Sequence, residues 1–158
     1  MRTLYICLLF ILLVLKTSFS FAQEKDVCVE LNIEYTITMS QNRVVGTADL
    51  MIQDMMYTVS SNDVYVCSDG ESVWTLDMLA KEAYIEPARE DLYGFETLEV
   101  LHAELEKMKT SGAGRFELTD GNIVEVKVNS FSESQKKSVT SFRPQIEFGP
   151  EWAVTDLR

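Results

Sequence analysis

The stretch from Gly46 to Pro87 constrains the fold most, because it divides into short apolar segments separated by turn residues. Its centre is the turn Ser68-Asp69-Gly70-Glu71, and an Asp-Gly pair between two apolar segments is a strong hairpin signal. Segments at this spacing predict a series of short antiparallel strands. Apolar and aromatic residues fill the strand positions: Leu50, Ile52, Met55, Tyr57, Val59, Val64, Val66, Val73, Leu76, Tyr84 and Ile85. So much apolar surface favours a binding surface over a catalytic centre.

A long strand is predicted before this stretch, over residues 27–39, where apolar and polar residues alternate. Strand side chains point to opposite faces in turn, so this strand has one apolar and one polar face. Its apolar face comprises Val27, Val29, Leu31, Ile33, Tyr35, Ile37 and Met39. The polar face is expected to meet water, as antiparallel sheets allow.

The pattern changes after Pro87. Leu98, Leu101, Leu105 and Met108 are spaced as one face of a helix within residues 88–110. Strands are then predicted over 116–119 and 123–128, joined by Asp120-Gly121, and further strands over 139–142 and 145–148. We therefore predict an α+β, mostly β fold built as a single domain over residues 23–158.

The first 22 residues have the layout of a signal peptide. Arg2 precedes an unbroken apolar run from Leu4 to Leu15, and Ser20-Phe21-Ala22 offers small residues for cleavage. A membrane span needs about 20 apolar residues, so this run is short for one, although an uncleaved anchor is the alternative. We expect a protein that is exported and loses this segment by cleavage.

The charge balance limits the partners. A formal net charge of −11 repels the phosphates of nucleic acids and anionic lipid headgroups, and no basic stripe offsets it. Nucleic-acid binding is therefore not expected.

Two cysteines, Cys28 and Cys67, follow the predicted cleavage site. In an oxidising compartment they form either a disulfide or two buried free thiols, and the sequence leaves both alternatives open. Neither has a histidine nearby, so they make a poor zinc site, and no calcium-loop motif is present. We predict no metal and no cofactor.

Catalysis is not predicted either. His102 is the only histidine, and no nucleophile motif such as G-x-S-x-G accompanies it. The chain is therefore interpreted as a binding protein rather than an enzyme, with no catalytic residue.

Methionines and tryptophans are candidates for an apolar cavity. Met51, Met55 and Met56 cluster in sequence, and methionine is frequent on surfaces that accept varied apolar ligands, although it also fills ordinary cores. Trp74 and Trp152 are likewise either core anchors or ligand-facing walls.

Several of these segments resemble the periplasmic outer-membrane lipoprotein carriers (LolA type). The segments are Gly46-Thr-Ala-Asp-Leu-Met-Ile, Met55-Met-Tyr-Thr-Val and Ser68-Asp-Gly-Glu-Ser-Val-Trp-Thr-Leu-Asp, with the tail Phe148-Gly-Pro-Glu-Trp-Ala-Val-Thr-Asp. The resemblance covers about 45 residues in the first half of the chain and about ten in the tail. Gln53-Asp54 stands where that family tends to carry Arg-Pro, so the chain resembles a short, divergent member.

The resemblance implies a half-open antiparallel β-barrel with a helical lid, whose concave face holds acyl chains of lipoproteins or another lipid. It also implies a periplasmic monomer that moves its ligand between an inner-membrane donor and an outer-membrane acceptor. The candidate lipid-binding residues are Leu31, Ile33, Tyr35, Leu50, Ile52, Tyr57, Val59, Trp74, Leu76, Leu101 and Leu105. The alternative is a non-enzymatic interaction module of the envelope with a filled core.

Overall fold

The computed structural model describes residues 27–54, 56–88, 110–117 and 121–158, and this part of the chain is mostly β-structure. The strands are β1 (Val27–Thr38), β2 (Arg43–Gln53), β3 (Met56–Ser60), β4 (Val64–Ser68), β5 (Ser72–Asp77), β6 (Glu82–Pro87), β7 (Ala113–Glu117), β8 (Ile123–Gln135) and β9 (Ala153–Asp156). One 3₁₀ helix, η2 (Val139–Phe142), follows β8. The predicted mostly β fold is therefore confirmed.

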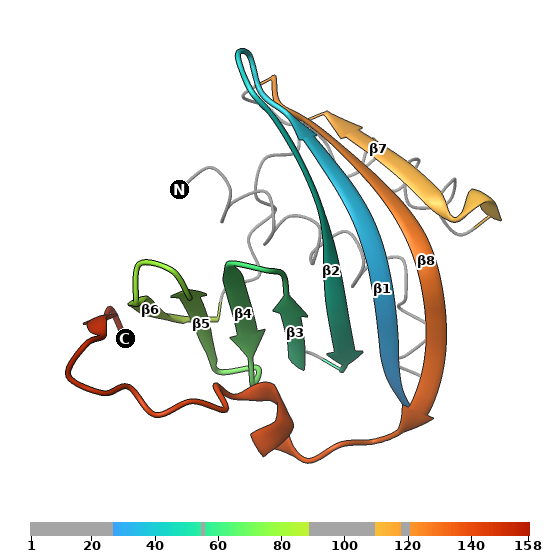
Figure 1. Ribbon diagram of the computed structural model, residues 1–158. Helices are drawn as coiled ribbons and strands as arrows, with labels where there is room; N and C mark the ends of the chain where they lie inside the picture. The colour runs from blue at the N-terminus through green and yellow to red at the C-terminus, as the bar shows by residue number, and fades with distance from the viewer. Residues whose placement is uncertain (1–26, 55, 89–109, 118–120) are drawn as a thin grey trace.

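The nine strands form one open sheet in the order β7-β8-β1-β2-β3-β4-β5-β6-β9. Neighbouring strands are antiparallel except β6 and β9, which are parallel. β7 and β9 are the two edges, so the sheet does not close into a barrel. The long strands β1, β2 and β8 sweep through a curve, and the short strands β3 to β6 form a second limb (Figure 1).

The predicted alternation in residues 27–39 is the framework of the long limb. Leu31, Ile33 and Ile37 are buried on one face of β1, whereas Glu34 on the other face is exposed. β1 pairs with β2 through a local hairpin and with β8 from far along the sequence. A register shift opposite Asn32 and Ile33 adds one residue to β8, and such a bulge increases local bending.

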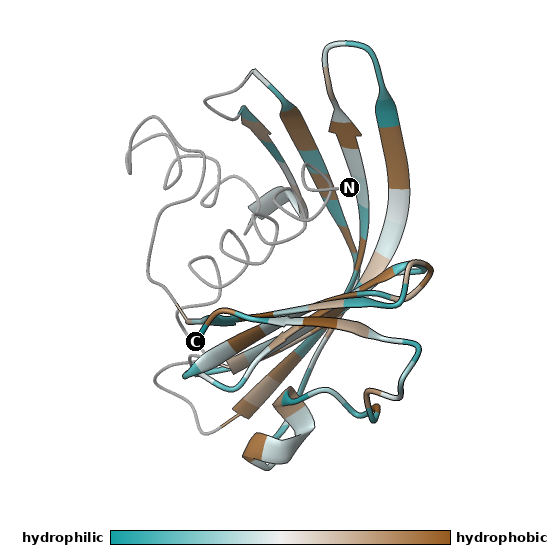
Figure 2. Ribbon diagram, turned by 90° about the vertical axis from the view of Figure 1, so that its left-hand side faces the viewer, coloured by the Kyte–Doolittle hydropathy of each residue, from teal (hydrophilic) through white to brown (hydrophobic). Residues whose placement is uncertain are grey.

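The two faces of the sheet carry different clusters. We call the inner face the one that bears the larger apolar cluster and lies within the angle between the two limbs; the opposite one is the outer face. The apolar cluster of the inner face comprises Val29, Leu31, Ile33, Tyr35, Ile37, Ala48, Leu50, Ile52, Tyr57, Val59, Val64, Val66, Phe116, Val124 and Val126. Hydrophobic and hydrophilic residues alternate along the strands accordingly (Figure 2).

A C-terminal strap, residues 136–152, crosses the outer face from the end of β8 to the start of β9 (Figure 1). Ile146, Phe148 and Trp152 of the strap pack against the second apolar cluster, formed by Cys67, Trp74, Leu76, Ala83 and Ile85. The rings of Phe148 and Trp152 meet edge to face with their centroids 5.4 Å apart. The strap therefore covers the outer face of the short-stranded limb.

Polar contacts fasten the strap to both limbs. The side chain of Gln53, at the end of β2, donates to the Lys137 carbonyl at 3.0 Å and accepts from the Lys137 amide at 2.7 Å. Lys137 also pairs with Glu30 at 2.6 Å. Further along, the guanidinium of Arg143 donates to Asp69 at 2.8 Å in the β4–β5 turn.

The expectation of strands over 139–142 and 145–148 was wrong. Residues 139–142 form η2, and residues 145–148 run irregularly along the strap. Phe142 is fully buried whereas Val139, one turn earlier, is exposed, so this segment is anchored through the Phe142 side chain rather than through strand pairing. The predicted signal peptide and nearly all of the predicted helix over 88–110 lie outside the described residues.

Candidate functional site

The inner face is the candidate functional site, and most of the predicted ligand-contacting residues lie on it. These are Leu31, Ile33, Tyr35, Leu50, Ile52, Tyr57 and Val59, and each is less than 9% exposed. They form rows across neighbouring strands because paired residues of a sheet point to the same face. One row runs through Leu31, Leu50, Val59 and Val66, and the next through Val29, Ile52 and Tyr57.

Sequence reasoning missed part of this face. Val124 and Val126 of β8 and Phe116 of β7 extend it on one side of β1, and Val64 and Val66 of β4 extend it on the other. The alternation Val124-Glu125-Val126-Lys127 carries the signal for β8, but pairing with β1 depends on a contact too distant in sequence to predict. The apolar face thus continues from β7 across to β4.

Trp74 and Leu76 correct the predicted site. Trp74 pairs with Cys67 and Leu76 with Tyr65, on the outer face, where the strap covers them. Their neighbours Val73, Thr75 and Asp77 take the inner positions of β5 instead. The larger apolar residues of β5 point outward because the strap buries them there. Leu101, Leu105 and His102 lie outside the described residues.

The inner face becomes polar towards β5 and β6. Ser68, Thr75 and Asp77 are buried there, and Glu82, Tyr84 and Glu86 of β6 are half-buried. Asp77 accepts two hydrogen bonds from the Leu79 and Ala80 amides at 2.9 and 2.7 Å, so it shapes the β5–β6 turn. The Tyr84 hydroxyl donates to Glu82 at 3.1 Å.

Gly46 meets the aromatic ring of Tyr35 in the half of the β1–β2 pair that is nearer the hairpin turn. The two residues face each other in register. A Cβ atom at Gly46 would lie 2.6 Å from the Tyr35 hydroxyl oxygen, closer than such atoms can approach. Glycine here lets the ring lie flat across β2, and burial raises the pKa of the Tyr35 phenol.

The two cysteines are free thiols, so the disulfide alternative is not realised. Cys28 lies on β1 and Cys67 on β4, with β2 and β3 between them, too far apart for a bridge. Both are buried. Burial raises the pKa of the Cys67 thiol to about 12 and also raises that of Cys28, so both behave as small apolar groups.

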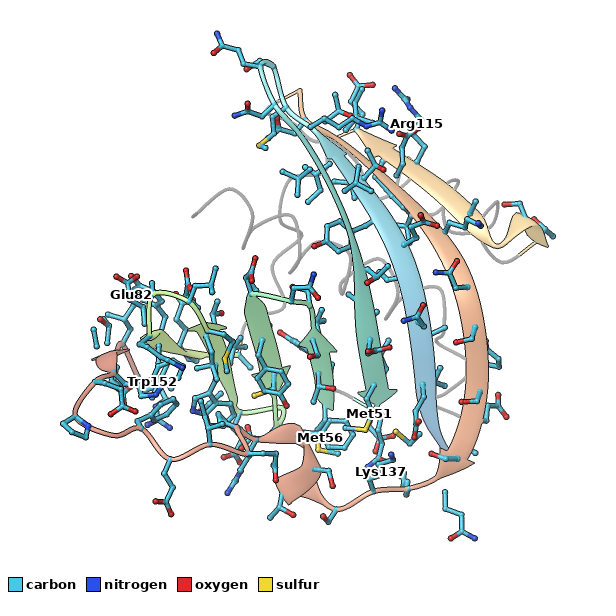
Figure 3. All side chains as sticks on the ribbon, viewed as in Figure 1. Met51, Met56, Glu82, Arg115, Lys137 and Trp152 are labelled. Carbon is cyan, nitrogen blue, oxygen red and sulfur yellow. The ribbon has the colours of Figure 1, made fainter. Side chains whose placement is uncertain are left out.

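Met51 and Met56 of the methionine cluster do not belong to the inner face. Met51 pairs with Glu30 and Met56 with Gln53, which are outer-face positions. Both lie beside Lys137 at the foot of β2 and β3 (Figure 3). Met55 lies outside the described residues, and Trp152 belongs to the strap.

Two pockets lined by described residues open mainly on the outer face. One, of about 660 Å³, is lined by residues of β1, β7 and β8, including Glu34, Arg115 and Lys127, and by Thr110 and Ser111 before β7. The other, of about 330 Å³, crosses β8, β1, β2 and β3, and its lining includes Met51, Thr58 and Lys137. Leu31 and Leu50 also border the second pocket. Val126 is the inner-face cluster residue that borders the first pocket, and apart from these three residues the members of that cluster line neither pocket.

The described residues offer no metal centre. No group of three or more histidine, cysteine, aspartate or glutamate side chains among them is placed to hold a metal ion. Within the same ranges, no helix has the length and apolarity needed to cross a bilayer.

Comparison with known proteins adds little to this geometry. No known protein family matches the chain, and neither does any curated protein. Among solved structures, it is similar to an uncharacterized conserved protein from Thermus thermophilus, with 10% identity, a TM-score of 0.47 and 99% of each chain covered. No argument about function follows from a likeness at this level, so any proposed function depends on the chain itself.

Proposed function

We propose that this chain is a periplasmic, LolA-like carrier that binds the acyl chains of lipoproteins, or another lipid, on the inner face of its sheet. One observation carries the proposal: apolar side chains continue without interruption across β7, β8, β1, β2, β3 and β4 on the inner face of an open, curved sheet. The proposal assigns no catalytic residue and no cofactor.

The physical need for such a face is clear. Burying an acyl chain is worth about 0.8 kcal/mol per CH₂ group, so a long chain does not cross water unaided. A curved sheet with one apolar face can shelter it, and polar groups at the rim can orient its head. The resemblance of Ser68-Asp-Gly-Glu-Ser-Val-Trp and of the tail to lipoprotein carriers supports the same class. An inner-membrane donor and an outer-membrane acceptor are the partners that this role requires.

The burial of the inner face sets a condition on binding. Ile33, Val59 and Val124 have no exposed surface. A ligand therefore reaches these side chains only after a conformational change that exposes them, so we expect association slower than diffusion.

The same burial favours a second candidate, a non-enzymatic interaction module of the envelope. Side chains that are already buried need no ligand to shield them from water. In that case the inner face is an ordinary core, and a partner protein binds elsewhere.

Native mass spectrometry of protein purified gently from its own cells decides between the two. A carrier is expected to retain lipid and to bind fluorescent fatty-acyl probes. Protein that repeatedly carries no lipid and binds no probe would favour the interaction module.

A pair of variants on β2 locates the binding face. Ala48 is buried on the inner face, and the adjacent Thr47 is exposed on the outer face. Ala48→Leu fills space over the inner face and is expected to weaken probe binding by about tenfold, the equivalent of about 1.4 kcal/mol. Thr47→Leu adds similar bulk on the other side and should bind normally. Equal binding by both variants, with both folded by circular dichroism, would place the ligand elsewhere.

A further inference from the structure

Charged residues of the described strands are divided between the two faces. The basic residues Arg43, Arg115 and Lys127 all take outer-face positions. Arg115 pairs with Glu125 and Lys127 with Glu34, and both glutamates are on the outer face. Arg43 is next to inner-face Val44 on β2, so its side chain points to the opposite, outer face. Among the strand residues that the structure describes, the inner face therefore has neither lysine nor arginine.

The charges on the inner face are negative instead. Asp77, Glu82 and Glu86 lie at the β5–β6 end of this face. Asp77 is between Val64 of the inner cluster and Glu82, because it pairs with both. Glu86 pairs with Val73, which packs against the same cluster. Glu133 pairs with Val29 at the opposite, β8 side. Glu82 lies at the β6 end of the short limb (Figure 3).

Neutral hydrogen-bonding groups accompany the acids at the β5–β6 end. Thr75 pairs with Tyr84 in the row that continues the apolar residues Val59 and Val66. Along this row the side chains change from aliphatic to hydroxyl-bearing as the sheet is crossed towards its β9 edge. The hydrogen bond from Tyr84 holds the Glu82 carboxylate on the same side of β6.

We infer that the ligand is an acyl amphiphile whose polar end carries no negative charge and lies over β5 and β6, with its chain over the apolar rows from β4 to β8. This inference rests on the proposed function and specifies the ligand class. The acyl chain follows the apolar part of each row, which leaves the head beside Thr75, Glu82 and Tyr84. An anionic head there would meet carboxylates with no basic strand residue to balance them, and like charges placed close together repel.

Displacement of a bound neutral fluorescent acyl probe tests this. Three competitors share the palmitoyl chain and differ at the head: monopalmitoylglycerol is uncharged, palmitoylcholine is cationic, and palmitate is anionic at neutral pH. We expect the first two to displace the probe, and palmitate to compete at least about tenfold less well at low salt.

A matched pair of charge variants identifies the cause. Glu82→Gln with Glu86→Gln keeps the shape of the side chains and removes two charges, so palmitate should gain affinity while monopalmitoylglycerol is unchanged. Glu34→Gln removes one charge from the outer face and should leave all three competitors unchanged. The circular dichroism and thermal midpoint of each variant establish that it is folded.

The outcomes separate the two proposals. Failure of every acyl compound to bind contradicts the proposed function itself. Equal binding of all three heads leaves a carrier but overturns the inference about its ligand. A preference for neutral and cationic heads that persists in the double variant assigns the selection to other residues, and also overturns it.

Discussion

At the scale of single residues, Gly46 and Tyr35 give the sharpest test of the structure. A methyl group at position 46 collides with the buried Tyr35 ring, so Gly46→Ala is expected to lower the free energy of unfolding by about 1–3 kcal/mol, as overpacking does. Chemical denaturation measures the loss.

A second change provides the control for this collision. Tyr35→Leu removes the ring, so Gly46→Ala should cost less in the Tyr35→Leu background than in the natural chain. Additive effects in the double-mutant cycle would mean that the two residues are not in contact.

The Asp69 carboxylate makes stability depend on pH. Burial alone would raise the pKa of this carboxyl group. Hydrogen bonds from the Ser72 and Glu71 amides and from Arg143 lower the pKa by more than burial raises it, so the net pKa lies below the usual value. A lowered folded pKa means that Asp69 stabilises the fold fully above its unfolded pKa of about 3.9, and that this contribution is lost as pH falls through the folded pKa.

Asp69→Asn isolates that contribution. The difference in unfolding free energy between the natural chain and the variant should be largest near neutral pH and shrink on acidification below about pH 4. Urea titrations at several pH values measure it. A difference that stays constant with pH would show that the carboxylate charge has no part in holding Arg143.

At the scale of elements, the strap depends on η2. Phe142 is fully buried and Val139, three residues earlier in the same helix, is 47% exposed. Phe142→Ala is expected to destabilise the fold by about 3–5 kcal/mol because it leaves a cavity. Val139→Ala is the matched control and should change stability by less than about 0.5 kcal/mol. Similar thermal midpoints for both variants would contradict the described packing of the strap.

The sequence predicts those elements whose signals are local. The alternation of residues 27–39 and the Asp69-Gly70 turn identify β1 and the β4–β5 hairpin, and Gly70 has the positive φ of 95° that the turn requires. The sequence alone does not predict which face of a short strand points inward. Trp74 and Leu76 point outward because the strap, distant in sequence, covers them. No pattern within the sequence of β5 indicates that the strap covers these two residues.

At the scale of the whole molecule, the sequence predicts the part of the candidate site on β1, β2 and β3. It does not predict how far the apolar face extends across the other strands. Alternation places Leu31, Leu50 and Val59 on one face once hairpins join their strands. The contribution of Val124 and Phe116 depends on the pairing of β8 with β1, for which sequence patterns give no register. The acidic end of the face likewise follows from the register of β6 against β5.

The position of β1 within the sheet predicts which backbone hydrogen bonds break last when the protein unfolds. β1 is hydrogen-bonded on both sides, to β2 and β8, and most of its inner side chains are buried, whereas all four residues of the edge strand β9 are exposed. Amides of β1 should exchange hydrogen only through global unfolding, and those of β9 through local opening. Hydrogen exchange followed by mass spectrometry resolves the two, and equal protection would argue against β9 as a separable edge.

The pairing of β1 with β8 also governs the order in which the chain can fold. The β1–β2 hairpin can form early, but β1 then has an unsatisfied edge and a bare apolar face until β8, synthesised much later, arrives to flank it. Strand edges left open in this way are sites of mispairing and aggregation. For a chain exported through a membrane channel, as the proposed function requires, that hazard lasts throughout the passage, so we expect the yield of folded protein to depend on chaperones that shield incomplete sheets.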